Sequence, residues 1–179
     1  MSILSGKRLM VLCFNEISMP VSTNEQLLGD LEAFAQSAAT ATELMREIVT
    51  RLAELPNYNW VGFYMIERGR PGEPEQMLVL GPFSGADTPH QRIPLNRGIC
   101  GAAAASGKTI VVDDVHSDPR YLACSIETKS EIVVPVFTHG RVVGELDIDS
   151  HAPATFSGPD RELVEACAAL LGHYLGHNQ

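Results

Sequence analysis

The hydrophobic residues near both ends of this chain repeat with the spacing of an α-helix. Residues 22–36 begin with two residues that commonly cap helices and carry an acid in the first turn. Residues 40–55 place most of their apolar side chains three or four positions apart, and Pro56 ends the pattern. Residues 157–178 begin with Ser157 as a cap. The pattern predicts two helices near the N-terminus and one at the C-terminus.

Between these helices the pattern changes to runs of aromatic and β-branched residues, which are typical of strands. We expect strands, one of them only a brief extended piece, at residues 59–67, 77–83, 92–94, 109–115 and 131–150. The last run is long enough for two strands joined by a turn at His139-Gly140. Residues 99–108 are rich in alanine and predict a short helix that Gly107 ends. Hairpins and short connections favour a central antiparallel sheet flanked by helices, which is an α+β fold.

The start of the chain lacks a clear hydrophobic period. We expect residues 1–25 to form an N-terminal arm or extension and residues 26–179 to form a single domain. A short apolar patch is broken at Asn15 and Glu16 and has no cleavage site of small residues, so no signal peptide is expected. No apolar run approaches the length of a membrane span, so we expect no membrane association.

The net charge of −9 over 179 residues narrows the classes of partner. Binding to nucleic acid or to an anionic membrane needs a basic surface, and no basic stripe is visible. Without a secretory signal we expect a cytoplasmic protein, in whose reducing compartment each cysteine is a buried small residue or a reactive thiol. The cysteines are far apart and lack zinc-type spacing, so no metal site is expected; they are Cys13, Cys100, Cys124 and Cys167.

Two acids in the segment "GELDIDS" are the first candidates for chemistry. Asp147 and Asp149 are two positions apart, so in a strand they share one face, while Leu146 and Ile148 fill the other. Repulsion between neighbouring carboxylates raises the pKa of at least one of them. A strand face turned to solvent would tolerate the same two acids, and this pair alone does not decide between the two interpretations.

An aromatic pair stands on the first predicted strand. Trp60 and Tyr64 are four positions apart and therefore share one strand face. An indole and a phenol in this arrangement could wall a small apolar pocket with a hydrogen-bonding tip. Core filling is the commoner role for such residues, so this interpretation stays open at this point.

Two of the cysteines are placed for reactivity. Cys100 lies at the start of the predicted alanine-rich helix, where the helix N-terminus favours the thiolate. A small buried residue at a tight turn would fit that position as well. Cys124 lies in a polar loop beside Ser125 and Thr128, away from any apolar period. Cys167 lies at helical spacing from apolar neighbours and is expected in the core.

Five motifs occur in a characteristic order: "NWVGFYM", "LVLGPFSG", "RIPLNRGICGAAAASGKTIVVDDV", "ACSIETKSEIVVP" and "GELDIDS". Over residues 26–172 this set resembles the GAF-domain free methionine-(R)-sulfoxide reductases. The resemblance implies a GAF fold, a homodimer, and free methionine-(R)-sulfoxide as the substrate. It implies that Cys124 attacks the sulfoxide and that Cys100 corresponds to a second family cysteine. The substrate-binding residues of the family fall on Trp60, Tyr64, Glu131, Asp147 and Asp149.

One departure from the family pattern concerns recycling. The family usually carries a third cysteine two places before the arginine of its "C-x-R-I-P" motif, and here that place is His90. The resemblance then implies that Cys124 becomes a sulfenic acid, that Cys100 condenses with it, and that thioredoxin reduces the disulfide. No metal or organic cofactor is expected. The alternative is a non-catalytic GAF domain that binds a small molecule or senses an oxidant.

Overall fold

The structure is a computed structural model that describes residues 23–123 and 125–178. Over these residues the chain forms a six-stranded antiparallel sheet with the strand order β3-β2-β1-β6-β5-β4. The strands are β1 (Trp60–Arg68), β2 (Gln76–Ser84), β3 (Arg92–Pro94), β4 (Ile110–Val112), β5 (Ser130–Thr138) and β6 (Arg141–Ser150). The helices are α1 (Thr23–Ala35), α2 (Ala41–Ala53), α3 (Gly98–Ser106) and α4 (Gly158–His177). The expected α+β fold with a central antiparallel sheet is confirmed.

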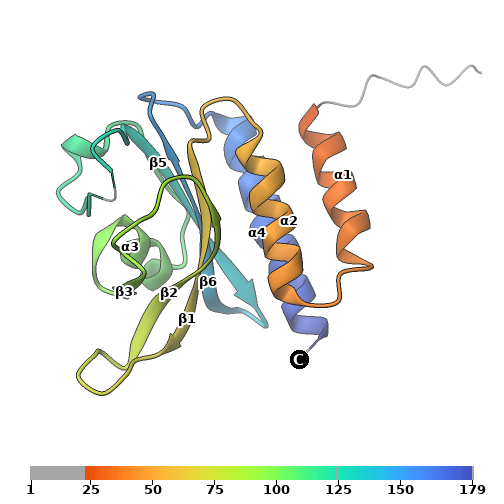
Figure 1. Ribbon diagram of the computed structural model, residues 1–179, viewed down its shortest axis with the longest axis horizontal. Coiled ribbons are helices and arrows are strands. Elements are labelled where there is room, and N and C mark those ends of the chain that lie inside the picture. Colours follow the sequence, from red (N-terminus) through yellow and green to blue (C-terminus); the bar gives the residue numbers. More distant parts are fainter. Residues whose placement is uncertain (1–22, 124, 179) are drawn as a thin grey trace, which may run out of the picture.

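Three helices cover one face of the sheet, and we call this the helix side. Helices α2 and α4 pack against the strands, and α1 packs on α4 and α2 as an outer layer (Figure 1). Leu146 and Ile148 of β6 point into this layer and are fully buried. Helix α2 presents the predicted stripe to them, because Leu44, Ile48 and Leu52 are buried on one side of the helix. Each fully buried aliphatic side chain of this kind contributes about 1.5–3 kcal/mol.

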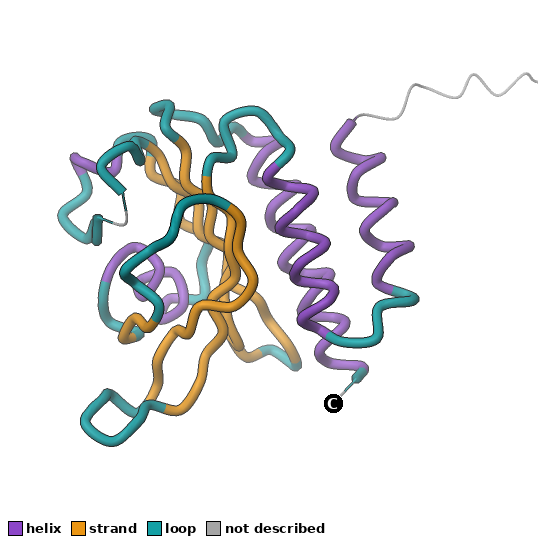
Figure 2. The backbone as a smooth tube through the Cα atoms, viewed as in Figure 1, coloured by secondary structure: helices purple, strands orange, loops and turns teal. Residues whose placement is uncertain are grey.

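The opposite face of the sheet is covered by α3 and by the long connections around it, and we call this the site side (Figure 2). A second, smaller apolar cluster forms here between α3 and the strands. Ile99 and Ala103 of α3 pack with Tyr64 of β1 and Val133 of β5 in this cluster. The two faces of the central strands are therefore covered by separate apolar clusters.

The predicted elements are confirmed with one difference of extent. The strand expected at residues 109–115 is shorter, because β4 ends at Val112 and a 3-10 turn follows at Val115–Ser117. The Asp114 side chain starts this turn by accepting a hydrogen bond from the His116 backbone at 3.0 Å. The hairpin turn lies at His139 and Gly140, as expected, and both residues have positive φ angles (48° and 74°). Within the described ranges no helix combines the length and apolar character needed to cross a bilayer.

Candidate functional site

Four carboxyl groups lie side by side on the site side of the sheet. Glu145, Asp147 and Asp149 alternate along β6 on one face, and Glu131 of β5 pairs directly opposite Asp149. All four are buried, with exposed fractions between 0% and 5%. We call these four residues the carboxyl cluster. Burial excludes the interpretation of Asp147 and Asp149 as acids on a solvent-facing strand.

Burial raises the pKa of every member of the carboxyl cluster. Loss of water is the largest cause for each, and it raises the pKa of Glu145 to about 8 and that of Asp149 to about 7. A hydrogen bond from Thr128 opposes part of the rise at Asp149. The pKa values of Glu131 and Asp147 also lie well above their usual range, through burial first and then through the neighbouring carboxylates. The sequence predicted a raised pKa for at least one of Asp147 and Asp149 through mutual repulsion; both are raised, and burial is the larger cause.

The carboxyl cluster has more acceptors than donors. Both carboxyl oxygens of Glu145 and Oδ1 of Asp147 are buried and find no hydrogen-bond partner within residues 23–123 and 125–178. Among the residues that the structure describes, the cluster takes part in no salt bridge. An unsatisfied buried polar group costs about 1–3 kcal/mol, which is unusual unless the group has a function. The cluster is suited to a ligand that brings its own positive charge and its own hydrogen-bond donors.

Helix α3 places a thiol against this cluster. Cys100 is the third residue of α3 and is 5% exposed. Its Sγ lies 3.5 Å from Oδ2 of Asp147 and 3.9 Å from Oε1 of Glu131, at sulfur hydrogen-bond distances. The predicted position of Cys100 at the helix start is confirmed. The structure thus brings together Cys100, Glu131, Asp147 and Asp149, which come from three different elements.

The predicted aromatic pair forms a wall beside the cluster. Trp60 pairs with Asp149 across β1 and β6, and its ring stacks on Tyr64 with centroids 6.2 Å apart. Trp60 also stacks on Phe83 at 5.7 Å and donates its indole N–H to the Ala86 carbonyl at 3.1 Å. Tyr64 is 1% exposed and donates its hydroxyl to the His90 carbonyl at 2.8 Å. Both aromatic side chains pack in the smaller apolar cluster on the site side of the sheet.

The indole of Trp60 fits between two glycines. A Cβ added at Gly62 would collide with the six-membered ring of Trp60. A Cβ added at Gly85 would lie 2.6 Å from Cδ1 of the same indole, and Gly85 has a φ of +126°, which side chains rarely adopt. The close approach therefore requires glycine at both positions, and it fixes one orientation of the indole.

The predicted nucleophile, Cys124, lies outside the described residues, so its role stays a prediction. The residues on either side of it contact the site. His90 Nε2 lies at hydrogen-bond distance, 3.1 Å, from the Ala123 carbonyl, and the Tyr121 hydroxyl donates to the Ser125 carbonyl at 3.0 Å. His90, at the place of the family's third cysteine, thus connects the Tyr64 wall to the loop.

A small cavity of about 130 Å³ opens next to the carboxyl cluster. Trp60 and Asp149 line it from the sheet, and the loop around Thr128 closes it. It is smaller than the pockets of roughly 300–1,000 Å³ that take drug-sized ligands, and it suits a small metabolite. The other lining residues are Asn59, Ala86, Asp87, Thr88, Ser125, Glu127 and His151.

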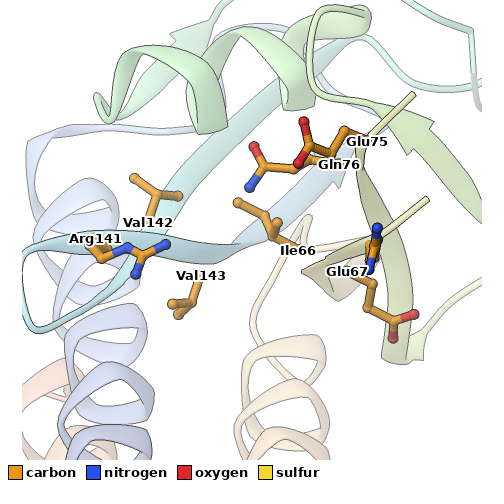
Figure 3. A pocket seen from close by; sticks show the side chains of 8 residues that line it. Ile66, Glu67, Glu75, Gln76, Arg141, Val142 and Val143 are labelled. Atoms are coloured by element: carbon orange, nitrogen blue, oxygen red, sulfur yellow. The ribbon is translucent and has the colours of Figure 1, made fainter.

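A larger cavity, of about 320 Å³, lies at the other end of β1 and β6 (Figure 3). Ile66, Val142 and Val143 form its apolar part, and charged side chains such as Glu67 and Arg141 surround them. None of the predicted site residues that the structure describes lines this cavity. Size alone therefore does not select the candidate site, because Trp60 and Asp149 line the smaller cavity.

Glu145 is the site residue that the sequence analysis missed. It stands two positions before Asp147, so the same alternation that pairs Asp147 with Asp149 places Glu145 on their face. Its carboxyl group is fully buried next to Cys100, whose thiol opposes part of the pKa rise that burial causes. The signal was present in the segment "GELDIDS", where three acids alternate with two aliphatic residues.

Comparisons with known proteins agree with this architecture. The GAF domain family model matches residues 40–175. The free methionine-R-sulfoxide reductase of Escherichia coli is 33% identical over 145 residues, which is 81% of this chain and 79% of that protein. The free methionine-R-sulfoxide reductase of Neisseria meningitidis, solved in complex with its substrate, superposes with a TM-score of 0.76 at 35% identity, covering 84% of this chain and 87% of that one.

The fold also occurs in domains with other names. The GAF domain of a phosphoenolpyruvate-protein phosphotransferase from Coxiella burnetii superposes with a TM-score of 0.75 at 17% identity. The superposition covers 86% of this chain and 93% of that domain. At this identity the likeness extends to the fold alone. The fold by itself therefore does not separate an enzyme from a binding domain, and the site must decide.

Proposed function

The chain belongs to the GAF domain family, and we propose that it reduces free methionine-(R)-sulfoxide to methionine through cysteine thiols. The observation that carries the proposal is the carboxyl cluster, which is buried, has more acceptors than donors, and lies against the Cys100 thiol and the Trp60 wall. The relatives named as free methionine-R-sulfoxide reductases support the same substrate.

The chemistry of the substrate matches the cavity. A free amino acid carries an ammonium group, which would supply the positive charge and the donors that the carboxyl cluster needs. Asp149 lines the cavity and is the first carboxylate that such an ammonium would meet. The methyl group at sulfur would pack on the indole of Trp60. A methionine sulfoxide residue inside a protein has no free ammonium, so this arrangement favours the free amino acid.

The proposed reaction begins with the Cys124 thiolate, which attacks the sulfoxide sulfur. A carboxyl group of the cluster donates a proton to the sulfoxide oxygen, which is the role for which a raised carboxyl pKa is useful. The substrate S–O bond and the new S–S bond then break as the oxygen passes to Cys124 as a sulfenic acid, so the cysteine sulfur is oxidised by two electrons and the substrate sulfur is reduced by two. Methionine leaves, and the atoms and electrons balance.

The proposed recycling uses the second site cysteine. The Cys100 thiol attacks the Cys124 sulfenic acid, water leaves, and a disulfide forms. This bond requires the two Cα atoms to come within about 7 Å of each other. A dithiol protein of the thioredoxin class then reduces the disulfide and restores both thiols. No bound metal or organic cofactor takes part in these steps.

A non-catalytic GAF domain is the second candidate, and His90 is the observation that favours it. At this place the family usually has its third cysteine, whereas His90 here contacts the Ala123 carbonyl. A domain that cannot recycle its oxidised cysteine would bind the same ligand without turnover. The two candidates share the site and differ only in the fate of the bound ligand.

The deciding experiment couples turnover to NADPH oxidation through thioredoxin and its reductase. We expect consumption of the R epimer of free methionine sulfoxide and no consumption of the S epimer. Cys124→Ser should abolish turnover, and Cys100→Ala should turn over slowly with thioredoxin and be rescued by dithiothreitol, which attacks the sulfenic acid directly. Saturable binding of the substrate without any turnover by the reduced wild-type protein would establish the binding domain instead.

Cys167→Ala is the matched control for both cysteine variants. Cys167 is buried in the helix-side core, where burial raises its pKa to about 12, so it stays a protonated thiol. We expect this variant to keep wild-type turnover. A Cys167→Ala variant that lost activity while folded would transfer the resolving role to that residue.

We further propose a cytoplasmic homodimer whose N-terminal arm ends before Thr23, where α1 of the single domain begins, and not at residue 25 as expected from the sequence. The family resemblance supports the dimer. The net charge of −9 disfavours binding to nucleic acid or to an anionic membrane. Sedimentation equilibrium of the full chain and of a chain without residues 1–22, which keeps α1 whole, tests the dimer and the arm. If both chains are monomers, the proposed dimer is wrong. If the truncated chain does not fold, the arm is part of the domain.

A further inference from the structure

We propose that Cys100, Glu131 and Asp147 bind a zinc ion, and that this ion blocks the site against its substrate. The ion would be an inhibitor, since the proposed reaction uses none. The binding itself follows from the ligand atoms, and only the competition with substrate rests on the proposed function.

The three ligand atoms already have the spacing of a metal site. The thiol and the two carboxyl groups each offer one atom, and these atoms all lie within 4.8 Å of one another. In tetrahedral zinc, with a Zn–S bond of about 2.3 Å and a Zn–O bond of about 2.0 Å, neighbouring sulfur and oxygen ligands are about 3.5 Å apart. Cys100 Sγ and Asp147 Oδ2 are 3.5 Å apart, and Cys100 Sγ and Glu131 Oε1 are 3.9 Å apart. Both sulfur–oxygen distances therefore lie within about 0.4 Å of the spacing in tetrahedral zinc.

Unpartnered oxygens around the same point give an independent indication of a cation site. Asp147 is 2% exposed, and its Oδ1 has no hydrogen-bond partner. Glu145, which is fully buried next to Cys100, has two such oxygens and could supply a fourth ligand. A buried group of acceptors without donors is incomplete, and a divalent ion satisfies several of them at once.

The ligand types select zinc over the hard divalent ions. Calcium and magnesium need six or more oxygen ligands, or several retained waters, whereas one thiolate and two or three carboxylates give a four-coordinate set. The three ligands come from α3, β5 and β6, which explains why the sequence shows no zinc-type spacing. On binding, the thiol and the carboxyl groups release their protons to solvent and the ion replaces them.

A bound ion would stop the reaction in two ways. It would occupy the carboxylates that are proposed to receive the substrate ammonium. It would also hold the Cys100 sulfur in a metal bond, so that Cys100 could not condense with a sulfenic acid. Zinc and substrate should therefore exclude each other, and free methionine should protect the enzyme.

Cobalt(II) is the probe, because a thiolate bound to cobalt gives a charge-transfer band in the near ultraviolet. The full-length protein is reduced with a phosphine, desalted and titrated with Co²⁺ and then with Zn²⁺. We expect one equivalent of Co²⁺ to produce the band, together with the visible bands of tetrahedral cobalt, and Zn²⁺ to remove both. Asp147→Asn should weaken binding at least tenfold. Cys167→Ala should keep the bands unchanged.

Two cysteine variants decide which sulfur binds the metal. Loss of the charge-transfer band in Cys100→Ala and in Cys100→Ser, with the wild-type circular dichroism spectrum retained, supports the site. A band that survives in both variants, or one that disappears in Cys124→Ser and not in Cys100→Ser, overturns it. If Cys100→Ala does not fold, Asp147→Asn and Cys100→Ser provide the same test.

Competition between zinc and substrate is measured in a separate experiment. The proposed metal site and the proposed reductase activity can then be disproved independently. Where the protein turns over methionine sulfoxide, the Zn²⁺ concentration for half inhibition should rise in proportion to substrate. Cys100→Ala, assayed with a monothiol in place of dithiothreitol, should lose at least tenfold in zinc sensitivity. Absence of turnover with the cobalt bands present removes the proposed function and leaves the metal site. Turnover without cobalt bands removes the metal site and leaves the function.

Discussion

Strand β6 has two faces that are equally buried and chemically opposite. On the helix side, Leu146 and Ile148 are fully buried among apolar residues of the helices. On the site side, Asp147 and Asp149 are 2% and 5% exposed, and among the described residues Oδ1 of Asp147 and both carboxyl oxygens of Glu145 find no hydrogen-bond partner. The protein completes the first face by itself, whereas the second face requires a group from outside. Burial therefore does not distinguish core from site here, but the balance of donors and acceptors does.

The two faces of β6 also contribute differently to the stability of the fold. A buried leucine contributes about 1.5–3 kcal/mol to stability, while an unsatisfied buried carboxyl group costs about 1–3 kcal/mol. The apolar burial on the helix side therefore offsets the stability that the unsatisfied carboxyl groups on the site side cost. Substitutions on the helix side should change stability and leave chemistry unchanged, and substitutions on the site side should do the reverse.

The largest effect should come from Leu146→Ala on the helix side. Removing a fully buried leucine side chain leaves a cavity, and we expect a loss of about 2–5 kcal/mol in the free energy of unfolding. Urea unfolding measures this loss. Turnover at a temperature where the variant is folded should stay within about twofold of wild type. A much larger loss of turnover in the folded variant would mean that the two faces are coupled.

Asp147→Asn should show the opposite behaviour. The amide cannot donate the proton or carry the charge of the carboxyl group next to Cys100, so we expect kcat/KM to fall about 100-fold, or about 2.7 kcal/mol. The free energy of unfolding should change by less than about 1 kcal/mol, because the Asn side chain matches the size of the Asp147 carboxyl group and, like its protonated form, carries no charge. Asp149→Asn is the companion variant. Wild-type kinetics with lost stability in both would make these acids structural.

Glu145→Gln should change how stability depends on pH. Burial raises the pKa of Glu145 to about 8 in the folded protein, above the value of about 4.5 in the unfolded chain. Its contribution to stability is therefore present below pH 4.5 and is lost as pH rises through about 8. The variant should lose less stability than wild type between pH 5 and pH 9, by about 4 kcal/mol, since each unit between the folded and unfolded pKa is worth about 1.4 kcal/mol.

Urea unfolding at pH 5, 7 and 9 measures the change at Glu145. Glu162→Gln, on an exposed position of α4, is the matched control and should keep the wild-type pH dependence. Parallel curves for wild type and Glu145→Gln would show that the Glu145 carboxyl is already ionised in the folded protein.

The smallest effects should come from two tyrosine hydroxyls, one on each side. Tyr58, in the helix-side core, donates to the Asp160 carboxylate of α4 at 3.0 Å, and Tyr64 donates to the His90 carbonyl at 2.8 Å. Tyr58→Phe and Tyr64→Phe should each lose about 1 kcal/mol of stability. Only Tyr64→Phe should raise KM, because only that hydroxyl holds the site wall. An equal change of KM in both variants would remove the distinction.

Local sequence patterns predicted the parts of the site that lie on single elements. Alternation along one strand placed Asp147 beside Asp149 and Trp60 beside Tyr64, and helix-start signals placed Cys100 in a first turn. The same alternation includes Glu145, which was missed. These predictions succeed because the direction of a side chain depends mainly on the backbone of its own element.

Contacts between elements could not be predicted in this way. Whether Asp147 faces solvent depends on α3 and the loop that cover it, and the pattern of β6 contains no information about that cover. The pairing of Glu131 with Asp149 depends on the register between β5 and β6. The 3.5 Å contact of Cys100 with Asp147 depends on how α3 packs on the sheet. The role of Cys124 rests on the family resemblance and stays a prediction.

The slot between Gly62 and Gly85 has an optical consequence. The chain contains one tryptophan, so its ultraviolet-excited emission above the tyrosine range comes from Trp60 alone. That indole is held in one orientation, donates to the Ala86 carbonyl, and lines the small cavity beside Asp149. A molecule that enters the cavity changes the polarity next to a single rigid fluorophore. The native protein thus carries its own reporter, and occupancy of the site can be followed by light without a label, a coupling enzyme or turnover.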